Sequence, residues 1–247
     1  MIAYSALAAV YDALTGDVPY EQWAAFAQKA FAKGKKPVKL VLELACGTGS
    51  LTRLLGQAGY EMIACDLSAD MLAVAREKCG ELTCPPVFLC QDMCQLDLYG
   101  TIDAAVCCLD SINYLTQLRQ LKQAFARVSL FLEPGGLFLF DVKTPLAFEE
   151  MGGLSSVEEL EGAFCAWQYG YDRKSRQAQH QVDVFLQEED GTWSRNTEWH
   201  EQRAYTREQL EQALQQAGLR VRHVYGSPGG QRVGEQTRRL FFVAEKP

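Results

Sequence analysis

The segment from Val38 to Leu72 (VKLVLELACGTGSLTRLLGQAGYEMIACDLSADML) constrains the fold of this 247-residue chain more than any other stretch. An apolar strand at 39–44 runs into a glycine turn and a helix at 51–57, and a second strand at 61–66 stops on an aspartate. Strands joined in this way run parallel, because a parallel pair needs a crossover connection, usually a helix. The segment therefore predicts a βαβ unit.

The same alternation of strands and helices continues to about residue 142. Ser68 is the expected N-cap of a helix at 70–78, and apolar residues recur at helical spacing from Leu118 to Leu132 before a Glu-Pro-Gly-Gly stop signal. Further strands are predicted at 87–90, 102–109, 137–142, 221–225 and 238–244. Unbroken apolar strands of this kind are buried on both faces. We predict an α/β fold with a Rossmann-like, doubly wound, seven-stranded, mostly parallel sheet.

The rhythm changes after about Pro145. Strand-like segments at 164–171, 179–188 and 192–205 follow one another, with a Glu-Asp-Gly hairpin loop before the last of them. Thr206 and Gln209 then form a capping box that opens a new helix. We predict a core at 1–145 and 206–247, and a small antiparallel insertion at 146–205.

The predicted insertion is rich in aromatic residues, which serve either as a substrate lid or as the core of a small sheet. They are Trp167, Tyr169, Tyr171, Trp193 and Trp199. Because side chains alternate along a strand, the last strand presents two faces. Trp193, Trp199, Arg203 and Tyr205 share one of them, and Glu198, His200 and Gln202 share the other.

Composition narrows the class of protein. The N-terminal MIAYSALAAVYDAL lacks a basic flank, so an amphipathic helix is expected rather than a signal peptide, and no apolar run is long enough to span a bilayer. Nine cysteines without a C-x-x-C pair, and three scattered histidines, predict reduced thiols, no metal site and a cytoplasmic protein. The formal net charge of −7 argues against a general nucleic-acid binder but leaves a local basic patch open.

Three strand ends carry polar residues that can meet one ligand. The turn at 45–50 aims free N–H groups at it, and Glu43 before the turn can meet a positive charge. Asp66 lies 17 residues beyond Gly49, where an acidic residue faces a ribose in doubly wound sheets. Asp92 closes the third strand, where its carboxylate can meet an adenine edge. We predict a nucleoside-sized crevice at this sheet edge.

The glycine spacing indicates which nucleoside. A dinucleotide fingerprint needs a third glycine where Thr52 stands, and no G-K-[ST] of a P-loop follows the turn. An acidic residue before the turn suits a sulfonium or ammonium group better than a pyrophosphate. S-adenosylmethionine (SAM) is therefore favoured over NAD. An NAD-dependent oxidoreductase and a non-catalytic module that binds SAM or S-adenosylhomocysteine (SAH) stay as alternatives.

These motifs also carry a family resemblance. LELACGTGSL, DLSADML, QDM and EPGGLFLFDV, in this order over residues 38–142, resemble the motifs of class I SAM-dependent methyltransferases. CLDSINYL, VYDALTGDVPYEQW and TEWHEQRAYT resemble the bacterial YqeM-like group in particular. The family commonly has a glycine where Ser50 stands here.

The resemblance implies a role for each matching residue. Glu43 would lie near the methionine ammonium, and Asp66 would accept the ribose hydroxyls. The full set of expected cofactor contacts is Tyr11, Glu43, Ala45, Gly47, Gly49, Asp66, Leu67, Met71, Asp92, Met93, Leu109 and Asn113. Simpler interpretations stay open: Asp66 and Asp92 could each cap a local turn, Glu43 could bind a loop amide, and Tyr11 could be a core residue.

Candidate catalytic residues follow the fourth predicted strand. Asp110 is a candidate proton acceptor, Asn113 and Tyr114 could orient an acceptor, and His200 with Glu198 could form a base and its orienting partner. Alternatively, Asp110 and Asn113 satisfy backbone groups of a capped loop. We expect methyl transfer to a small molecule, with RNA as a less favoured acceptor because of the negative net charge.

Overall fold

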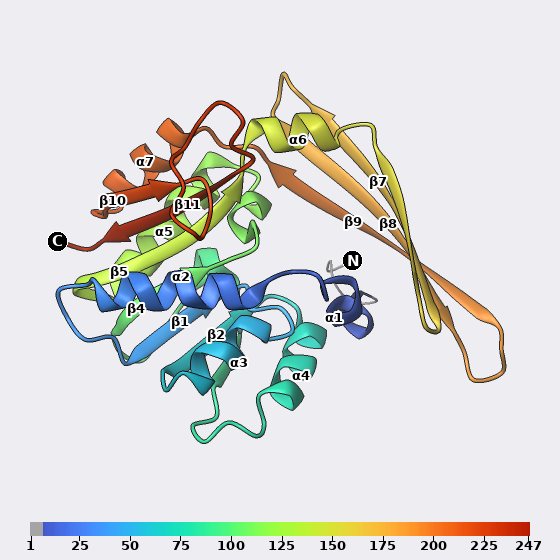
Figure 1. The fold of residues 1–247 in the computed structure, drawn as a ribbon, viewed down its shortest axis with the longest axis horizontal. Coiled ribbons are helices and arrows are strands. Elements are labelled where there is room, and N and C mark those ends of the chain that lie inside the picture. The colour runs from blue at the N-terminus through green and yellow to red at the C-terminus, as the bar shows by residue number, and fades with distance from the viewer. Residues whose placement is uncertain (1–6) are drawn as a thin grey trace.

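The computed structural model describes residues 7–247, and its core is one seven-stranded sheet (Figure 1). The strands are β1 (Leu40–Leu44), β2 (Glu61–Asp66), β3 (Val87–Cys90), β4 (Ile102–Cys107), β5 (Leu132–Lys143), β10 (Arg220–Tyr225) and β11 (Arg239–Glu245). Their order is β10-β11-β5-β4-β1-β2-β3, and only β11 is antiparallel to its neighbours. The predicted doubly wound sheet is confirmed. The order reverses at β1, which has β2 on one side and β4 on the other, and ligands bind beyond the strand ends at such a switch point.

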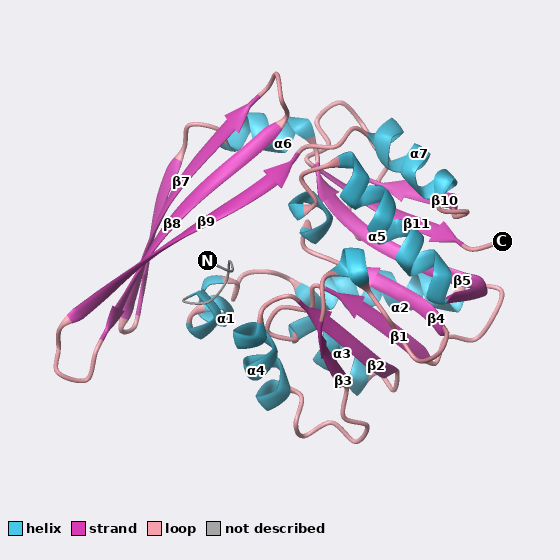
Figure 2. Cartoon of the chain, turned by 180° about the vertical axis from the view of Figure 1, so that it is seen from behind, coloured by secondary structure: helices cyan, strands magenta, loops and turns pink. Residues whose placement is uncertain are grey.

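Helices cover both faces of this sheet, as a parallel sheet requires. They are α2 (Tyr20–Ala32), α3 (Ser50–Gln57), α4 (Ala69–Lys78), α5 (Leu118–Phe131) and α7 (Arg207–Gln216). Adjacent residues of β1 show the layering, since Val41 packs with α2 and α3 while Leu42 packs with α5 and α7. Figure 2 shows α5 and α7 on the face of the sheet that is hidden in Figure 1. Ser68 caps α4 through the Met71 amide, and Thr206 and Gln209 form the predicted capping box.

The insertion is a separate antiparallel sheet that projects from the core (Figure 1). Its strands are β6 (Ser155–Leu160), β7 (Ala163–Asp172), β8 (Gln177–Gln187) and β9 (Trp193–Arg203), in that order. Helix α6 (Pro145–Met151) leads into it, capped by Thr144. The sequence analysis missed α6 and β6. Helix α6 has only seven residues, and β6 is an edge strand whose Val157 is exposed, so neither carries a long periodic signal.

Within β9 the two faces separate as predicted, and the polar one is buried. The prediction was wrong for Tyr205, because the strand ends at Arg203 and Tyr205 is completely buried, with its hydroxyl donating to the Leu115 carbonyl. Glu198, His200 and Gln202 lie inside, whereas Trp193 and Trp199 are about half exposed on the outer face. Tyr169 pairs with His180 and His180 pairs with His200, so these three share the inner face of the sheet. Trp193 and Trp199 therefore form neither a small-sheet core nor a cover over the inner face.

The N-terminal part of the described chain is short and irregular. Residues 1–6 of the expected amphipathic helix lie outside the described residues, and the rest is a 3₁₀ turn, η1 (Leu7–Ala9), followed by α1 (Tyr11–Leu14). Leu7 packs against Cys165, Val182 and Val184 of the insertion. Within residues 7–247, no helix is long and apolar enough to cross a membrane.

Candidate functional site

A cavity of about 270 Å³ lies where β1, β2, β3 and β4 end. All but two of the predicted cofactor contacts line it. They are Tyr11, Glu43, Ala45, Gly47, Asp66, Leu67, Met71, Asp92, Met93 and Leu109. The structure also adds Tyr20, Ser111 and Gln120 to the lining, which the sequence analysis did not single out. Gly49 and Asn113 do not line it.

The glycine turn after β1 depends on left-handed backbone. Gly47 has φ +54°, and its amide donates to Asp66 Oδ2 at 2.8 Å. Gly49 has φ +77°, and a Cβ there would lie 3.0 Å from the Cβ of Ala75. Gly49 therefore lets α3 and α4 pack closely, which explains why it lies behind the cavity wall rather than on it.

Glu43 is a buried carboxyl group at the end of β1. Burial raises its pKa to about 8, against the hydrogen bond that Thr52 Oγ1 donates to its Oε2. Thr52 stands where a dinucleotide fingerprint has glycine. The same residue whose presence disfavours NAD therefore positions Glu43 through a hydrogen bond. A positive ligand group beside this carboxyl would favour its ionised form and lower the pKa.

Asp66 and Asp92 each combine a local turn with a place on the cavity wall. The Asp66 carboxylate accepts from the amides of Gly47 and Ser68, and burial raises its pKa against these hydrogen bonds. Asp92 accepts from the Cys94 amide at 2.8 Å and caps the 3₁₀ turn η2 (Met93–Gln95). Asp66 and Asp92 therefore both accept hydrogen bonds within a local turn, as the capping interpretation requires, and both also line the cavity.

Three thiols also line the cavity, those of Cys46, Cys65 and Cys108. Burial raises the pKa of the Cys65 thiol to about 12, and it raises the pKa of the other two well above their ordinary value. The thiolate is the nucleophilic form of cysteine. These groups therefore stay protonated and do not compete as nucleophiles.

The loop after β4 has a strained backbone that a buried carboxylate holds. Strand β4 ends two residues earlier than predicted because Leu109 (φ +55°) and Asp110 (φ +53°) are left-handed, which is costly for residues with a side chain. Asp141, on β5, accepts from both of their amides, at 2.8 and 3.0 Å, and from Trp23 Nε1 at 2.9 Å. The sequence analysis missed Asp141, although a charged residue inside LFLFDV was a usable signal.

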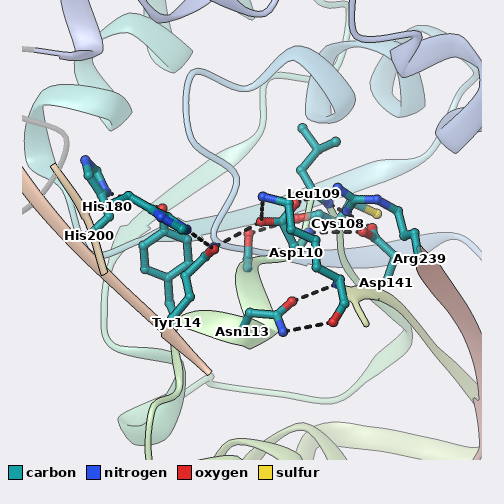
Figure 3. A network of polar contacts seen from close by, with 12 residues as sticks. Cys108, Leu109, Asp110, Asn113, Tyr114, Asp141, His180, His200 and Arg239 are labelled. Atoms are coloured by element: carbon teal, nitrogen blue, oxygen red, sulfur yellow. Dashed lines mark hydrogen bonds and ion pairs between the residues drawn. The ribbon is translucent and has the colours of Figure 1, made fainter. Parts of the chain in front are cut away.

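Asp110 points into an ionic network and not into the cavity (Figure 3). Arg239 lies 2.7 Å from Asp110 Oδ1 and also pairs with Asp141, and Lys143 lies 3.0 Å from Asp110 Oδ2. Burial alone would raise the pKa of Asp110, but Lys143 and Arg239 hold it well below its usual range. Such a carboxylate is a poor proton acceptor near neutral pH.

The insertion contacts this loop through Gln202. Its Nε2 donates to Asp110 Oδ2 at 3.0 Å, so its Oε1 is the atom that accepts from His180 Nε2, at 3.2 Å. Burial lowers the pKa of His180 to about 4, so this ring is neutral at pH 7. One polar chain thus connects β8, β9 and the loop after β4.

Asn113 joins three backbone segments instead of reaching the cavity. Its Nδ2 donates to the Arg203 carbonyl at 2.8 Å and its Oδ1 accepts from the Lys143 amide at 3.0 Å (Figure 3). The side chain is completely buried. These contacts match the alternative in which Asn113 satisfies backbone groups.

Tyr114 connects the cavity to a buried histidine. Tyr114 lines the cavity, and its hydroxyl lies 3.2 Å from His200 Nδ1 (Figure 3). His200 Nε2 lies 3.6 Å from Glu198 Oε2, and Glu198 Oε1 accepts from the Leu7 amide at 3.1 Å. The order of groups is hydroxyl, imidazole, carboxylate, which is the arrangement of a base and its orienting partner.

The sheet order, the glycine turn and the acidic strand ends define a SAM-dependent methyltransferase, and comparisons with known proteins agree. A family model described as a methyltransferase domain matches residues 41–136. A structure described as a SAM-dependent methyltransferase from Clostridium acetobutylicum is 28% identical, with a TM-score of 0.87 and 99% of both chains covered.

The full-length relatives place the chain more narrowly. YqeM of Bacillus subtilis (strain 168), which carries a methyltransferase name, is 32% identical over 98% of this chain and 97% of its own. A homologue of Geobacillus sp. (strain WCH70), named in the same way, is 30% identical over 99% of this chain and its whole own length. The protein belongs to the YqeM-like group of SAM-dependent methyltransferases.

Proposed function

We propose that the protein transfers the methyl group of SAM to a small-molecule acceptor held between the ends of the core strands and the insertion. The single observation that carries this proposal is the cavity that joins the ends of β1–β3 to Tyr114 and, through Tyr114, to the inner face of β9. The insertion at 146–205 then serves as the acceptor-side domain, with its buried polar face toward the reaction.

The cofactor contacts are assigned by chemistry and position. Glu43 meets the methionine ammonium, Asp66 accepts from the ribose hydroxyls, and Asp92 meets the adenine amino group. Gly47 contributes backbone that approaches the ligand closely, and Leu67, Met71, Met93 and Leu109 supply apolar walls. Tyr11 covers the cofactor from α1. Each of these residues lines the cavity, which supports the assignment.

Bound SAM supplies an electrophilic methyl group on a sulfonium that leaves as a neutral thioether. The residues of this chain therefore need to align the acceptor, exclude water and handle one proton. Alignment alone accounts for about 7–11 kcal/mol of a barrier in well-oriented reactions. The loop after β4 supplies alignment because Asp141 fixes the backbone of Leu109, which is part of the cavity wall.

We assign removal of the acceptor's proton to Tyr114 and His200. As the acceptor is methylated, the proton that it loses would pass to the Tyr114 oxygen while the Tyr114 proton passes to His200 Nδ1. Glu198 then stabilises the imidazolium through Nε2. Asp110 and Asn113 act as positioning residues in this scheme, since each is held by contacts outside the cavity.

Two observations favour a small molecule over RNA. A Streptomyces fradiae relative, 28% identical over 77% of this chain and 73% of its own, is named dTDP-3-amino-3,6-dideoxy-α-D-glucopyranose N,N-dimethyltransferase. The sequence has two short basic clusters, at 173–176 and 238–239, and one arginine of each is paired with an acidic side chain, Arg173 with Glu149 and Arg238 with Glu150. Arg239 is engaged inside the core.

Calorimetric titration of cofactor-stripped protein with SAM, SAH and NADH tests the cofactor. Micromolar binding of SAM and SAH with no heat from NADH is expected, and binding of NADH alone would overturn the assignment. A screen that measures SAH release then compares amino sugars and small amines with bulk tRNA. Release that depends on tRNA but on none of the small molecules would replace the small-molecule proposal with RNA methylation.

A further inference from the structure

A second cavity, of about 310 Å³, lies between α2 and β10. Strand β10 is the edge strand farthest from β3 in the sheet order, and the two cavities share no lining residue. Figure 1 shows β10 and the end of α2 away from the insertion and from α1. Methyl transfer at the first cavity does not use this second one.

The second cavity is lined by an excess of positive charge. Lys29 lies in the last turn of α2, Lys33 is the C-cap residue of that helix, and Arg222 enters from β10. Neither lysine forms an ion pair with another residue in the part of the chain that the structure describes. Among the lining residues, the carboxylate is that of Glu245. This charge stands out in a chain whose formal net charge is −7.

Glu245 orients Arg222 and leaves its outer edge available. The Glu245 carboxylate is buried, and it contacts Arg222 Nε at 3.1 Å, Lys35 Nζ at 2.7 Å and Arg220 at 3.7 Å. Three cations therefore share one carboxylate. Because Arg222 is held through Nε, its terminal N–H groups can serve a second anion in the bidentate geometry that guanidinium favours.

The remaining lining residues include three aromatic rings and two adjacent glycines. The rings of His223 and Tyr225 stack at 5.5 Å, and Phe26 meets Tyr225 edge-on at 6.2 Å. Gly229 and Gly230 also line the cavity, where backbone without side chains allows close approach of a ligand. The aromatic rings offer a surface on which a flat ligand ring can pack.

We propose that this cavity binds a small phosphate monoester attached to a planar ring. A phosphate monoester carries a charge of about −1.5 to −2 at pH 7, which matches Lys29, Lys33 and the outer edge of Arg222 better than a single carboxylate does. The ring occupies the aromatic wall. Interaction of the lysines with the end of α2 accounts for two cations at a helix C-terminus, but not for Arg222, the aromatic wall or the cavity between them.

The test is calorimetric titration of the full chain saturated with SAH, so that the first cavity is occupied. AMP is the probe, with adenosine and inorganic phosphate as partial probes. One AMP per chain is expected, at least tenfold tighter than either partial probe. The double variant Lys29→Gln, Lys33→Gln should weaken AMP at least tenfold, and its unchanged circular-dichroism melting curve should show that the fold is intact.

The matched control is Arg173→Gln, Lys174→Gln, which removes the same charge from an exposed turn of the insertion and should leave AMP affinity unchanged. Equal weakening by both double variants would mean that AMP follows net charge alone and would overturn the proposal. Absence of AMP binding, or binding that SAH abolishes, would overturn it as well. Equal affinity for AMP and inorganic phosphate would refute the assignment of the ring to the aromatic wall.

Discussion

The two sides of the main cavity are built in different ways. On the β1–β3 side (Glu43, Gly47, Asp66 and Asp92), contacts are local, with Glu43 and Thr52 9 residues apart and Gly47 and Asp66 19 apart. On the β4–insertion side (Asp110, Asn113, Tyr114, Asp141 and His200), partners are distant. Asn113 and Arg203 are 90 residues apart and Asp110 and Arg239 are 129 apart. Short sequence motifs therefore encode the residues of the β1–β3 side. The contacts of the β4–insertion side depend on elements that only the folded chain brings together.

The largest effect is expected from a substitution that disrupts the β4–insertion side. Asp141→Ala removes one of the two buried carboxylates that pair with Arg239, and it removes the acceptor of the Leu109, Asp110 and Trp23 donors. Removal of one member of a buried pair costs about 3–5 kcal/mol. Urea denaturation should show this loss in the free energy of unfolding.

The control for Asp141 is Asp97→Ala, because the ion pair of Asp97 with Arg127 is exposed. Exposed pairs contribute about 0–1 kcal/mol. Similar stability of the two variants would show that the Asp141 network does not hold the loop. Asp141→Asn, which keeps the shape and one acceptor, should fall between them.

The second expected effect concerns the proton that the acceptor loses during methyl transfer. Tyr114→Phe removes the hydroxyl that contacts His200 and should lower kcat by about 100-fold, the lower end for general acid–base catalysis. Calorimetry should find SAM affinity within about twofold of the wild type, because the ring remains. Tyr99→Phe, at a fully exposed tyrosine, is the control.

His200→Ala should cause a similar loss of kcat, and the double variant with Tyr114→Phe should be no worse than either single change, since residues that act as a unit are not additive. Additive losses would separate His200 from the relay. Unaltered methyl transfer by His200→Ala would make that histidine structural.

The β1–β3 side could be predicted from the sequence, whereas most contacts of the β4–insertion side could not. The strands of the core and the acidic ends of β1–β3 come from periodicity and motif spacing, which act over short separations. Asp110 was a candidate base because it follows β4. Its partners Lys143, Gln202 and Arg239 come from three other elements, and no local pattern announces them. The exposure of Trp199 depends in the same way on which face of β9 meets the core.

A third prediction uses pH to examine the β1–β3 side. Burial raises the pKa of Glu43 to about 8, so between its ordinary value of 4.5 and about 8 the folded chain holds a proton that the unfolded chain has lost. The contribution of Glu43 to stability is therefore present below the unfolded pKa and is lost as the pH rises through 8. Glu43→Gln, which cannot ionise, should gain on the wild type by about 1 kcal/mol per pH unit from pH 6 to pH 8.

Denaturation without cofactor at several pH values measures the difference in stability between the two proteins. His180 contributes an opposite dependence of stability on pH, but it is present in both proteins and therefore cancels in the difference. Addition of SAM should flatten the wild-type slope, because a cation beside Glu43 favours its ionised form. A difference that does not change with pH would place the Glu43 pKa near its ordinary value.

The smallest expected effect is the sharpest test of a motif-encoded residue. Asp66→Ala removes the carboxylate assigned to the ribose hydroxyls and should weaken SAM at least tenfold, or about 1.4 kcal/mol. Stability should change little, because Asp66 is buried at a cost that its amide hydrogen bonds offset. Asp70→Ala, at the exposed start of α4, removes the same charge nearby and should leave SAM affinity unchanged. Unchanged affinity in Asp66→Ala would limit Asp66 to holding the glycine turn, and a local contact would then have been mistaken for a ligand contact.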